Sequence, residues 1–248
     1  MILFALQAVI VPAAVGIFVL LLPRRAWSVE ATQGVSPWTA SLAVACAFVG
    51  SLCVTDGVSI FELDERWQFL VIAVGIVGAG GILCRDDQRE RWFTSMVIVL
   101  APIIAFLALR MPGFDGLGPR LMAGAGTGIA SLTMARPSER AGRWTAVIIA
   151  LASAAMAGML MSVGSSKVAF AAASVACVAL VGAAIAHARG GFRPGAAFAM
   201  ASLTTLAALA SYGAAYHEGE GVHPVAWWFV AFSPCVVVAS PAARRVSS

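Results

Sequence analysis

Residues 167–188 read KVAFAAASVACVALVGAAIAHA, and this stretch decides the fold class of the chain. Between Lys167 and Arg189 there is no Asp, Glu, Lys or Arg, and most of the residues are Ala, Val, Leu, Ile or Phe. A helix that crosses a bilayer needs about 20 mainly apolar residues, because each residue adds only about 1.5 Å along the helix axis. The stretch therefore predicts a transmembrane helix with a basic residue at each end.

Similar apolar stretches precede and follow this one, and the breaks between them contain Pro, Gly and charged residues. Such residues end helices and form turns. We therefore predict an all-α fold, a polytopic transmembrane helical bundle of about nine spans that forms one integral membrane domain over residues 1–248. The predicted spans lie near residues 2–22, 38–55, 67–84, 92–110, 119–135, 144–163, 167–188, 195–215 and 224–240.

The composition favours the same fold class. The chain has 248 residues, of which 60% are hydrophobic and 11% are charged, and its mean hydropathy is +0.91. Soluble domains have about 25% charged residues, so a soluble globule of this length could not bury so much apolar surface. The formal net charge of +4 would point to nucleic acid in a soluble protein, but here it reflects arginine-rich loops. We expect the lipid bilayer as the surroundings and no nucleic acid as a partner.

The basic residues indicate an orientation, because Lys and Arg are enriched in cytoplasmic loops. With the N-terminus outside and the C-terminus inside, twelve basic residues fall on the inner side and four on the outer side. The predicted inner residues are Arg24, Arg25, Arg85, Arg89, Arg91, Arg136, Arg140, Arg143, Arg189, Arg193, Arg244 and Arg245. The predicted outer residues are Arg66, Arg110, Arg120 and Lys167.

Two stretches leave alternatives for the span count. The range 119–135 is rich in Gly and Ala, which makes it the weakest of the predicted spans. Without this crossing most basic residues would fall on the outer side, so we include it. A count of seven or eight spans is the alternative. The first stretch lacks a basic segment before it and is followed by Arg24 and Arg25, so we expect an uncleaved helix rather than a signal peptide. The near absence of Lys and the absence of Asn indicate a GC-rich, bacterial genome and hence a multi-pass protein of the cell inner membrane.

Glycine residues predict how the helices pack. Lipid is as apolar as leucine, so helices associate in a membrane through close approach at small residues. Gly75 and Gly78 of the third span, and Gly124 and Gly128 of the fifth, are the predicted helix-packing residues, and we expect these two spans to be central. Hinging, or the lining of a narrow path, is the alternative role for these glycines.

One polar loop contains a candidate metal site. Residues 217–223 read HEGEGVH, and His217, Glu218, Glu220 and His223 are ligand types that bind Zn²⁺ or another transition metal. The spacing does not match H-E-x-x-H, and the glycines disfavour a helix that would present both histidines on one face, so a solvated polar loop is the preferred interpretation. We predict no cofactor, with Zn²⁺ or another transition metal as the alternative.

The interior of the predicted spans limits the function. No predicted span has Asp, Glu, Lys or Arg near its middle, where proton pumps and many ion-coupled carriers place ionisable groups. Pro12 and Pro102 lie within spans and could open backbone carbonyl groups toward a cavity. Trp227 and Trp228 are expected to anchor a helix at the outer membrane interface.

Our leading hypothesis is a small-solute permease or channel-like carrier of the inner membrane, with no catalytic residue. A non-catalytic membrane subunit or scaffold, which binds other membrane subunits of a larger complex, is the first alternative. An integral membrane enzyme with a metal at the outer His/Glu loop is the second alternative. A polar path to the middle of the membrane would favour the carrier, and a dry, filled bundle would favour the scaffold.

Overall fold

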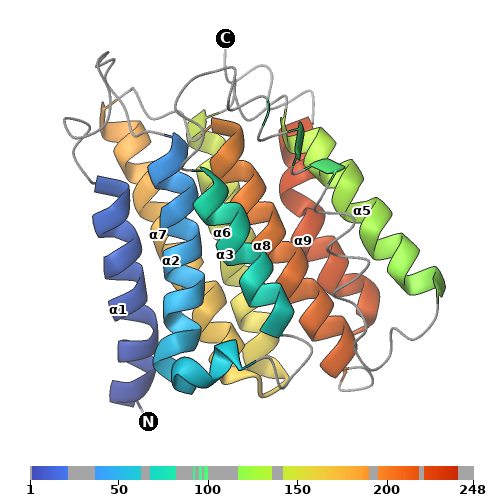
Figure 1. Ribbon diagram of the computed structural model, residues 1–248, viewed down its shortest axis with the longest axis horizontal. Helices are drawn as coiled ribbons and strands as arrows, with labels where there is room; N and C mark the ends of the chain where they lie inside the picture. Colours follow the sequence, from blue (N-terminus) through green and yellow to red (C-terminus); the bar gives the residue numbers. More distant parts are fainter. Residues whose placement is uncertain are drawn as a thin grey trace.

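The computed structural model describes residues 2–21, 37–62, 68–81, 92, 95–96, 98–99, 117–135, 142–189, 195–217 and 221–239. Within these residues the chain forms eight α-helices and one 3-10 helix, and no strand (Figure 1). The α-helices are α1 (Ile2–Leu21), α2 (Pro37–Asp56), α3 (Gln68–Gly80), α5 (Leu117–Ala135), α6 (Gly142–Ser162), α7 (Ser166–Arg189), α8 (Gly195–Tyr216) and α9 (Pro224–Ala239). The 3-10 helix η2 (Gly57–Phe61) follows α2 directly.

The all-α prediction is confirmed for this described part of the chain. Each of the eight α-helices coincides with a predicted span to within a few residues, whereas the predicted span 92–110 lies largely outside the described residues. Four helices contain segments long and apolar enough to cross a membrane, namely Thr39–Asp56, Trp144–Ser162, Ser166–Ile185 and Ala197–Tyr216. The apolar segments Leu6–Leu21, Gln68–Gly80 and Pro224–Val237 are shorter. These lengths and compositions are those of a membrane protein.

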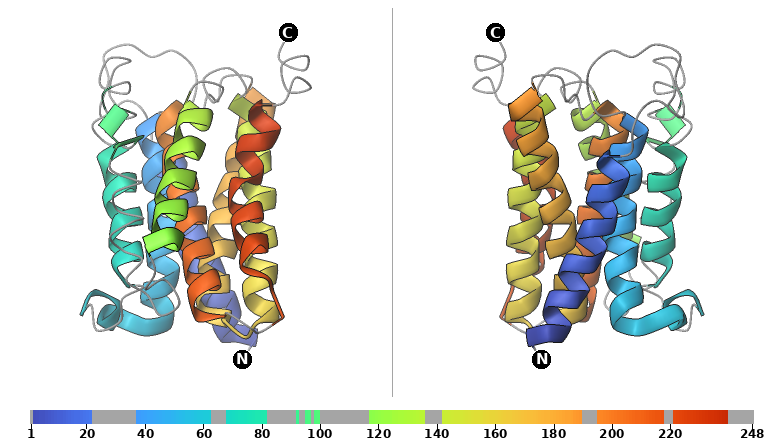
Figure 2. Two further views of the ribbon diagram at one scale, coloured as in Figure 1. Left: turned by 90° about the vertical axis from the view of Figure 1, so that its right-hand side faces the viewer. Right: turned by 90° about the vertical axis from the view of Figure 1, so that its left-hand side faces the viewer.

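The helices lie roughly along one axis, so that the bundle has two ends (Figures 1 and 2). We call the end at which Asp56, Ser165 and His217 lie the lower end, and the end at which Ser41 and Ala197 lie the upper end, as in Figure 1. Helices α1, α3, α5, α7 and α9 run from the lower to the upper end, and α2, α6 and α8 run in the opposite direction. Helix α3 thus ends at the upper end, and α5 begins at the lower end.

Among the described helices, α8 is the most enclosed. It packs against α2, α3, α5, α6 and α9, and 89% of its segment Ala197–Tyr216 is buried inside the protein, compared with 50–56% of the three other long apolar segments. Ala, Ser, Thr and Gly together make up most of its sequence, which lets neighbouring backbones approach closely. Helix α5 lies at the edge of the bundle and contacts α8 and α9 among the described elements (Figure 1). The central position expected for the fifth span is therefore occupied by α8 in the described part of the chain.

The four glycines predicted to pack helices differ in their surroundings. A Cβ atom added to Gly78 would lie 2.2 Å from Cβ of Ala45 and 3.2 Å from the carbonyl oxygen of Ser41, so α3 approaches α2 closely at this point. At Gly75 the nearest atom, in Val49, would be 3.9 Å away, which is an ordinary contact. Gly124 on α5 is buried and Gly128 is half-buried. The closest approach of α3 to α2 thus needs glycine at one of these positions, residue 78.

A second close approach joins α8 to α9 near the lower end. A Cβ atom added to Gly213 would lie 2.5 Å from ring atoms of Trp227, and the side chain of Trp227 is fully buried. The sequence interpretation of Trp227 as an interface anchor is therefore wrong, because its indole ring fills the space that Gly213 leaves open between the two helices. Its neighbour Trp228 is half-buried and stacks on Phe232, with ring centroids 5.4 Å apart.

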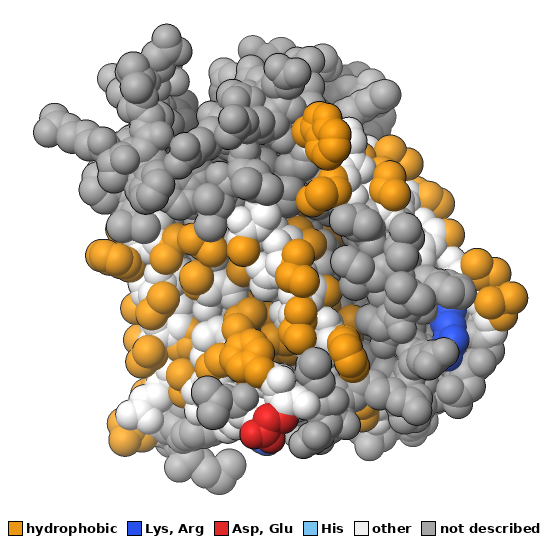
Figure 3. Space-filling view, in the orientation of Figure 1, with side chains coloured by type: hydrophobic (Ala, Val, Ile, Leu, Met, Phe, Trp, Pro, Cys, Tyr) orange, Lys and Arg blue, Asp and Glu red, His pale blue; other side chains and the backbone are white. Residues whose placement is uncertain are grey.

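The outer surface of the described helices is apolar over their middle. Figure 3 shows hydrophobic side chains along the middle of this face and acidic side chains at its lower edge. Large hydrophobic side chains point outward from helices all around the bundle, and Leu3, Ile10 and Phe18 of α1 and Phe229 of α9 are each more than half exposed. Lipid is the environment in which such a surface is stable.

Candidate functional site

At the lower end, a tight turn joins α6 to α7 through residues 163–165 only. Gly164 has a φ of 83°, its N–H donates to the carbonyl oxygen of Met161 (3.1 Å), and the N–H of Ser165 donates to that of Leu160 (2.9 Å). These two bonds close a Schellman motif, in which glycine adopts the left-handed conformation at little cost. The carbonyl oxygen of Ser165 then accepts the first hydrogen bond of α7, from Ala169 (3.0 Å). Ser165 is therefore held firmly between two helices.

The side chain of Ser165 connects this turn to the end of α8. Its Oγ lies 2.6 Å from Nε2 of His217 and 3.3 Å from the hydroxyl of Tyr212. The ring of Tyr212 also stacks on Tyr216 and meets the imidazole edge of His217, with centroids 4.9 and 5.8 Å apart. Ser165, Tyr212 and His217 are half-buried. This Ser–Tyr–His cluster fastens α7 to α8 at the lower end.

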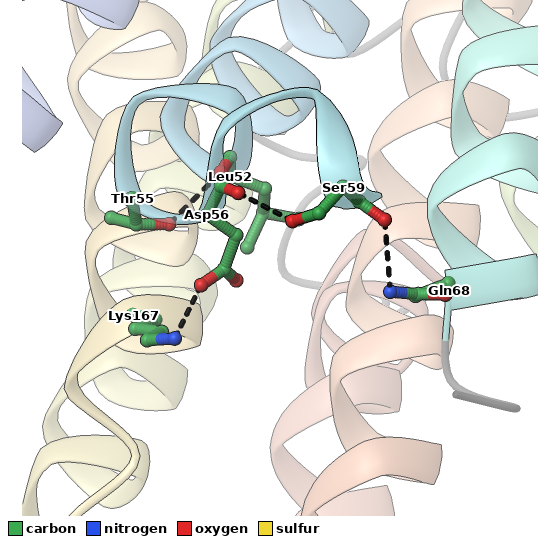
Figure 4. A network of polar contacts seen from close by, with 6 residues as sticks. All are labelled: Leu52, Thr55, Asp56, Ser59, Gln68 and Lys167. Atoms are coloured by element: carbon green, nitrogen blue, oxygen red, sulfur yellow. Dashed lines mark hydrogen bonds and ion pairs between the residues drawn. The ribbon is translucent and has the colours of Figure 1, made fainter. Parts of the chain in front are cut away.

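An ion pair fastens α2 to α7 at the same end. Nζ of Lys167, the single lysine of the chain, contacts a carboxylate oxygen of Asp56, the last residue of α2 (Figure 4). The carbonyl oxygen of Asp56 accepts from Oγ of Ser59 (2.6 Å), and Gln68 of α3 donates to the carbonyl oxygen of Ser59 (3.4 Å). The Lys167 side chain is 60% exposed, so water screens the pair, and its contribution to stability is about 0–1 kcal/mol.

Two of the four residues of the predicted metal site, His217 and His223, lie in the described part of the chain. Nε2 of His217 is hydrogen-bonded to Ser165, and Nδ1 of the exposed His223 accepts from the N–H of Val225 (3.3 Å) at the start of α9. Glu218 and Glu220 lie outside the described residues. Among the described residues, no three His, Cys, Asp or Glu side chains lie close enough to hold a metal ion. The two histidines therefore have separate structural contacts, at the ends of two helices.

A third polar cluster, which sequence reasoning missed, surrounds the proline of α1. Proline has no N–H, so Pro12 leaves the carbonyl oxygen of Ala8 without its usual helical donor. Oγ of Ser51, from α2, donates to this oxygen at 2.7 Å, and Oγ of Ser174, from α7, lies 3.4 Å from it. Both serine side chains are fully buried. A proline inside an apolar helix was the available signal, but the sequence did not show which serines would meet it.

A similar arrangement occurs in α9, within one helix. Pro234 frees the carbonyl oxygen of Val230, and Oγ of the adjacent Ser233 donates to it at 2.8 Å. Both prolines are therefore accommodated by a serine hydroxyl. The difference is that the hydroxyl in α9 is local, whereas those around Pro12 come from two other helices.

Among the described residues, three buried polar atoms have no hydrogen-bond partner: Oγ of Ser153 on α6, Oγ of Ser202 on α8 and Nε1 of Trp227 on α9. These residues are fully buried, and the three helices pack against one another. Most other buried hydroxyls bond to backbone carbonyl groups, such as those of Thr205 and Ser211 to Ala201 and Ala207. A buried polar group without a partner costs roughly 1–3 kcal/mol. Trp227 packs on Gly213, which lies eleven residues beyond Ser202 on α8, so the three atoms lie at different depths of the α6–α8–α9 group. At each of them a polar partner would gain free energy.

Comparison with known proteins finds no matching family model, no matching curated protein and no matching solved structure.

Proposed function

We propose that the protein is a multi-pass permease of a bacterial inner membrane that moves a small, uncharged polar solute through the interior of the helix bundle. The observation that carries this proposal is that buried polar atoms of Ser153, Ser202 and Trp227, at different depths of the α6–α8–α9 group, have no partner in the described part of the chain. Binding sites of carriers lie within the helix bundle, where a solute supplies the hydrogen bonds that the protein lacks. A hydroxyl, amide or urea group of a solute would pair with one of these atoms at a time.

The chemistry of the described interior supports an uncharged solute. The buried polar side chains are Thr39, Ser41, Ser51, Gln68, Thr127, Thr145, Ser153, Ser174, Ser202, Thr205 and Ser211, and none of them is ionisable. A charged solute inside the membrane would need an opposite charge, or many dipoles, to offset the loss of water. Hydroxyl and amide groups suit a neutral molecule better.

We further propose nine spans with the lower end outside the cell. Helix α3 ends at the upper end and α5 begins at the lower end, which supports the predicted span 92–110 as a crossing between them. The predominance of arginine in the segments that follow α1, α3, α5, α7 and α9 supports an inner, cytoplasmic upper end.

Labelling of a single cysteine tests this orientation. In a variant without the five native cysteines, we expect Ser166→Cys to react with a membrane-impermeant maleimide added to intact cells, because Ser166 is exposed at the lower end. Cysteine in place of Ala199, which is buried near the upper end, is the matched control for non-specific labelling. Labelling of Ser166→Cys only after the cells are broken would reverse the orientation.

Cysteine accessibility also tests the permease proposal. In the same background, we expect Ser153→Cys and Ser202→Cys to react with a small, charged methanethiosulfonate reagent at least about tenfold faster than Ala172→Cys, because the reagent reaches a thiolate only through water. Ala172 is fully buried, and its helix α7 lacks an unpartnered polar atom among its described residues. Addition of the transported solute should slow the reaction.

The second candidate function is a non-catalytic subunit of a membrane complex. The bonds of the buried hydroxyls of Ser41 and Ser51 to backbone carbonyl groups of neighbouring helices favour it, because such bonds fix helices relative to one another. If Ser153→Cys and Ser202→Cys are as unreactive as Ala172→Cys, the interior is dry, the permease proposal fails and the scaffold is favoured.

A further inference from the structure

Helix α1 lies at one edge of the bundle, where α2 and α7 cover one of its sides (Figure 1). Ala8, Pro12 and Gly16 lie on the covered side and are buried. The opposite side is exposed along the length of the helix, and among the described residues no other helix covers it. This exposed side is apolar, with one exception, Gln7.

Gln7 is unusual among the residues that face lipid. Of the described side chains that are exposed and lie more than one turn from the ends of their α-helix, Gln7 is the only one with an amide, hydroxyl or charged group. Its amide has no hydrogen bond to another side chain or backbone group of the described residues.

The depth of Gln7 places its amide against lipid. Gln7 lies five residues after Ile2, the first residue of α1, which is about 7.5 Å along the helix axis. Leu3, one turn nearer to the lower end on the same side, is 72% exposed, so apolar surface lies on both sides of Gln7. An amide in an apolar environment without a hydrogen bond costs free energy. The exposed side of α1 therefore favours a partner with a polar group at this depth.

A second copy of the chain supplies such a group by symmetry. All copies have one orientation in the bilayer, so a two-fold axis along the membrane normal places Gln7 of one copy opposite Gln7 of the other, at the same depth. A carboxamide has two N–H donors and a carbonyl acceptor, so two of them can donate to each other reciprocally. Glutamine side chains form such hydrogen bonds between helices in membranes.

The spacing of the exposed residues suits a parallel pair of helices. Gln7, Val11, Ala14, Phe18 and Leu21 are all exposed and follow one another at steps of four, three, four and three residues. Residues at these steps form one seam between two helices that wind around each other, and one polar residue in the seam fixes their register. Ala14, in the middle of the seam, lets the backbones approach closely. We propose that α1 binds α1 of a second copy along this seam, with the two Gln7 amides hydrogen-bonded to each other.

This dimer does not rest on the permease proposal, because its tests measure association rather than transport. The first test is cross-linking in membranes of a variant without the five native cysteines. We expect Ala14→Cys to form an intermolecular disulfide on oxidation with copper phenanthroline, at least about fivefold faster than Val15→Cys, because a disulfide needs closely spaced Cα atoms. Val15 is the matched control, since it is also exposed and adjacent in depth but lies about 100° further around the helix.

The second test measures the contribution of the amide. In phosphatidylcholine vesicles, energy transfer between copies labelled at Ser166→Cys, over a range of protein-to-lipid ratios, gives the dissociation constant of the dimer. Gln7→Leu should raise this constant about tenfold or more, because it removes two interhelical hydrogen bonds. The exchange variant that combines Leu6→Gln with Gln7→Leu should dimerise as weakly as Gln7→Leu. It keeps the composition and moves the amide about 100° around the helix.

The folded protomer is a separate readout in these tests. Both Leu6 and Gln7 are exposed, so the thermal midpoint of each variant in detergent should stay within about 2 °C of that of the natural protein.

Each other outcome overturns the proposal. Such outcomes are a monomer at every protein-to-lipid ratio, a dissociation constant that Gln7→Leu leaves unchanged, and equal cross-linking of Ala14→Cys and Val15→Cys. Cross-linking of Ala14→Cys in native membranes to a protein of another mass, and not to a second copy, assigns the exposed side of α1 to a different subunit and also overturns the dimer.

Discussion

Gly78→Ala should destabilise the protein by about 3 kcal/mol or more, and Gly78→Leu should prevent folding. The added Cβ atom would lie 2.2 Å from Cβ of Ala45, a contact that real structures do not show, and 3.2 Å from the backbone oxygen of Ser41. Neither neighbour is the flexible end of a side chain, so α3 would have to move away from α2. That movement would also break the hydrogen bond from Ser41 to the carbonyl oxygen of Gly78 (3.1 Å). Overpacking usually costs about 1–3 kcal/mol, and the lost bond adds to it.

The matched control is the same substitution at Gly158. This glycine lies on α6, and an added Cβ atom would meet nothing within 4 Å. Gly158→Ala should therefore stabilise the helix by roughly 0.5–1 kcal/mol, because alanine loses less backbone entropy. Thermal midpoints of the two variants in detergent, by fluorescence-detected gel filtration, measure the difference. Equal midpoints for the two variants would contradict the close approach of α3 to α2.

Ser51→Ala should cost about 1–3 kcal/mol, and Pro12→Ala should largely restore the loss. The alanine at position 51 leaves the carbonyl oxygen of Ala8 with the distant hydroxyl of Ser174 at 3.4 Å. Alanine at position 12 returns an N–H to the helix at the position where it bonds to that oxygen. In the Pro12→Ala background, Ser51→Ala should cost less than about half of its original value.

A double-mutant cycle of midpoints or unfolding free energies gives this coupling, which we expect to reach about 1 kcal/mol. Pro12 also packs against Gly50, with its Cβ 3.4 Å from where a Cβ of Gly50 would lie, so Pro12→Ala alone loses some contact. The cycle removes that contribution. Thr205→Ala combined with Pro12→Ala is the control pair, because Thr205 bonds within α8, and it should show additive effects. Additive effects of Ser51→Ala and Pro12→Ala would refute the pairing.

Helix positions were largely predictable from the sequence. Charged residues, Pro and Gly cannot continue an apolar helix in lipid without cost, so they mark the ends of the helices. The short turn at residues 163–165 falls at the break between the predicted spans 144–163 and 167–188. The relative positions of the helices were not predictable. Small residues are common in several helices, so they do not show which helix lies at the centre. Contacts with several neighbouring helices enclose α8, whereas α5 contacts α8 and α9 among the described elements.

The candidate sites were harder to predict for the same reason. The polar contacts that matter join residues far apart in the chain, such as Ser165 with His217 and Ala8 with Ser51 or Ser174. The sequence singled out His217 because other residues of metal-ligand types lie beside it in residues 217–223. In the structure its side chain is hydrogen-bonded to Ser165, in the turn between α6 and α7. The prediction for Trp227 was wrong because an aromatic residue near a helix end can lie either in the headgroup region or against a glycine of a neighbouring helix. The sequence does not show that Gly213 of α8 lies beside Trp227, and this contact places the ring inside the bundle.

The short connection between α6 and α7 has a consequence for biogenesis. With three residues between the helices, neither can settle in the bilayer far from the other, so the pair should leave the insertion machinery as a preformed hairpin. Contacts between neighbours in the chain form without a large loss of loop entropy. This hairpin is therefore a nucleus for the assembly of other helices. Helices α1 and α2 are synthesised before it, and α8 is synthesised after it.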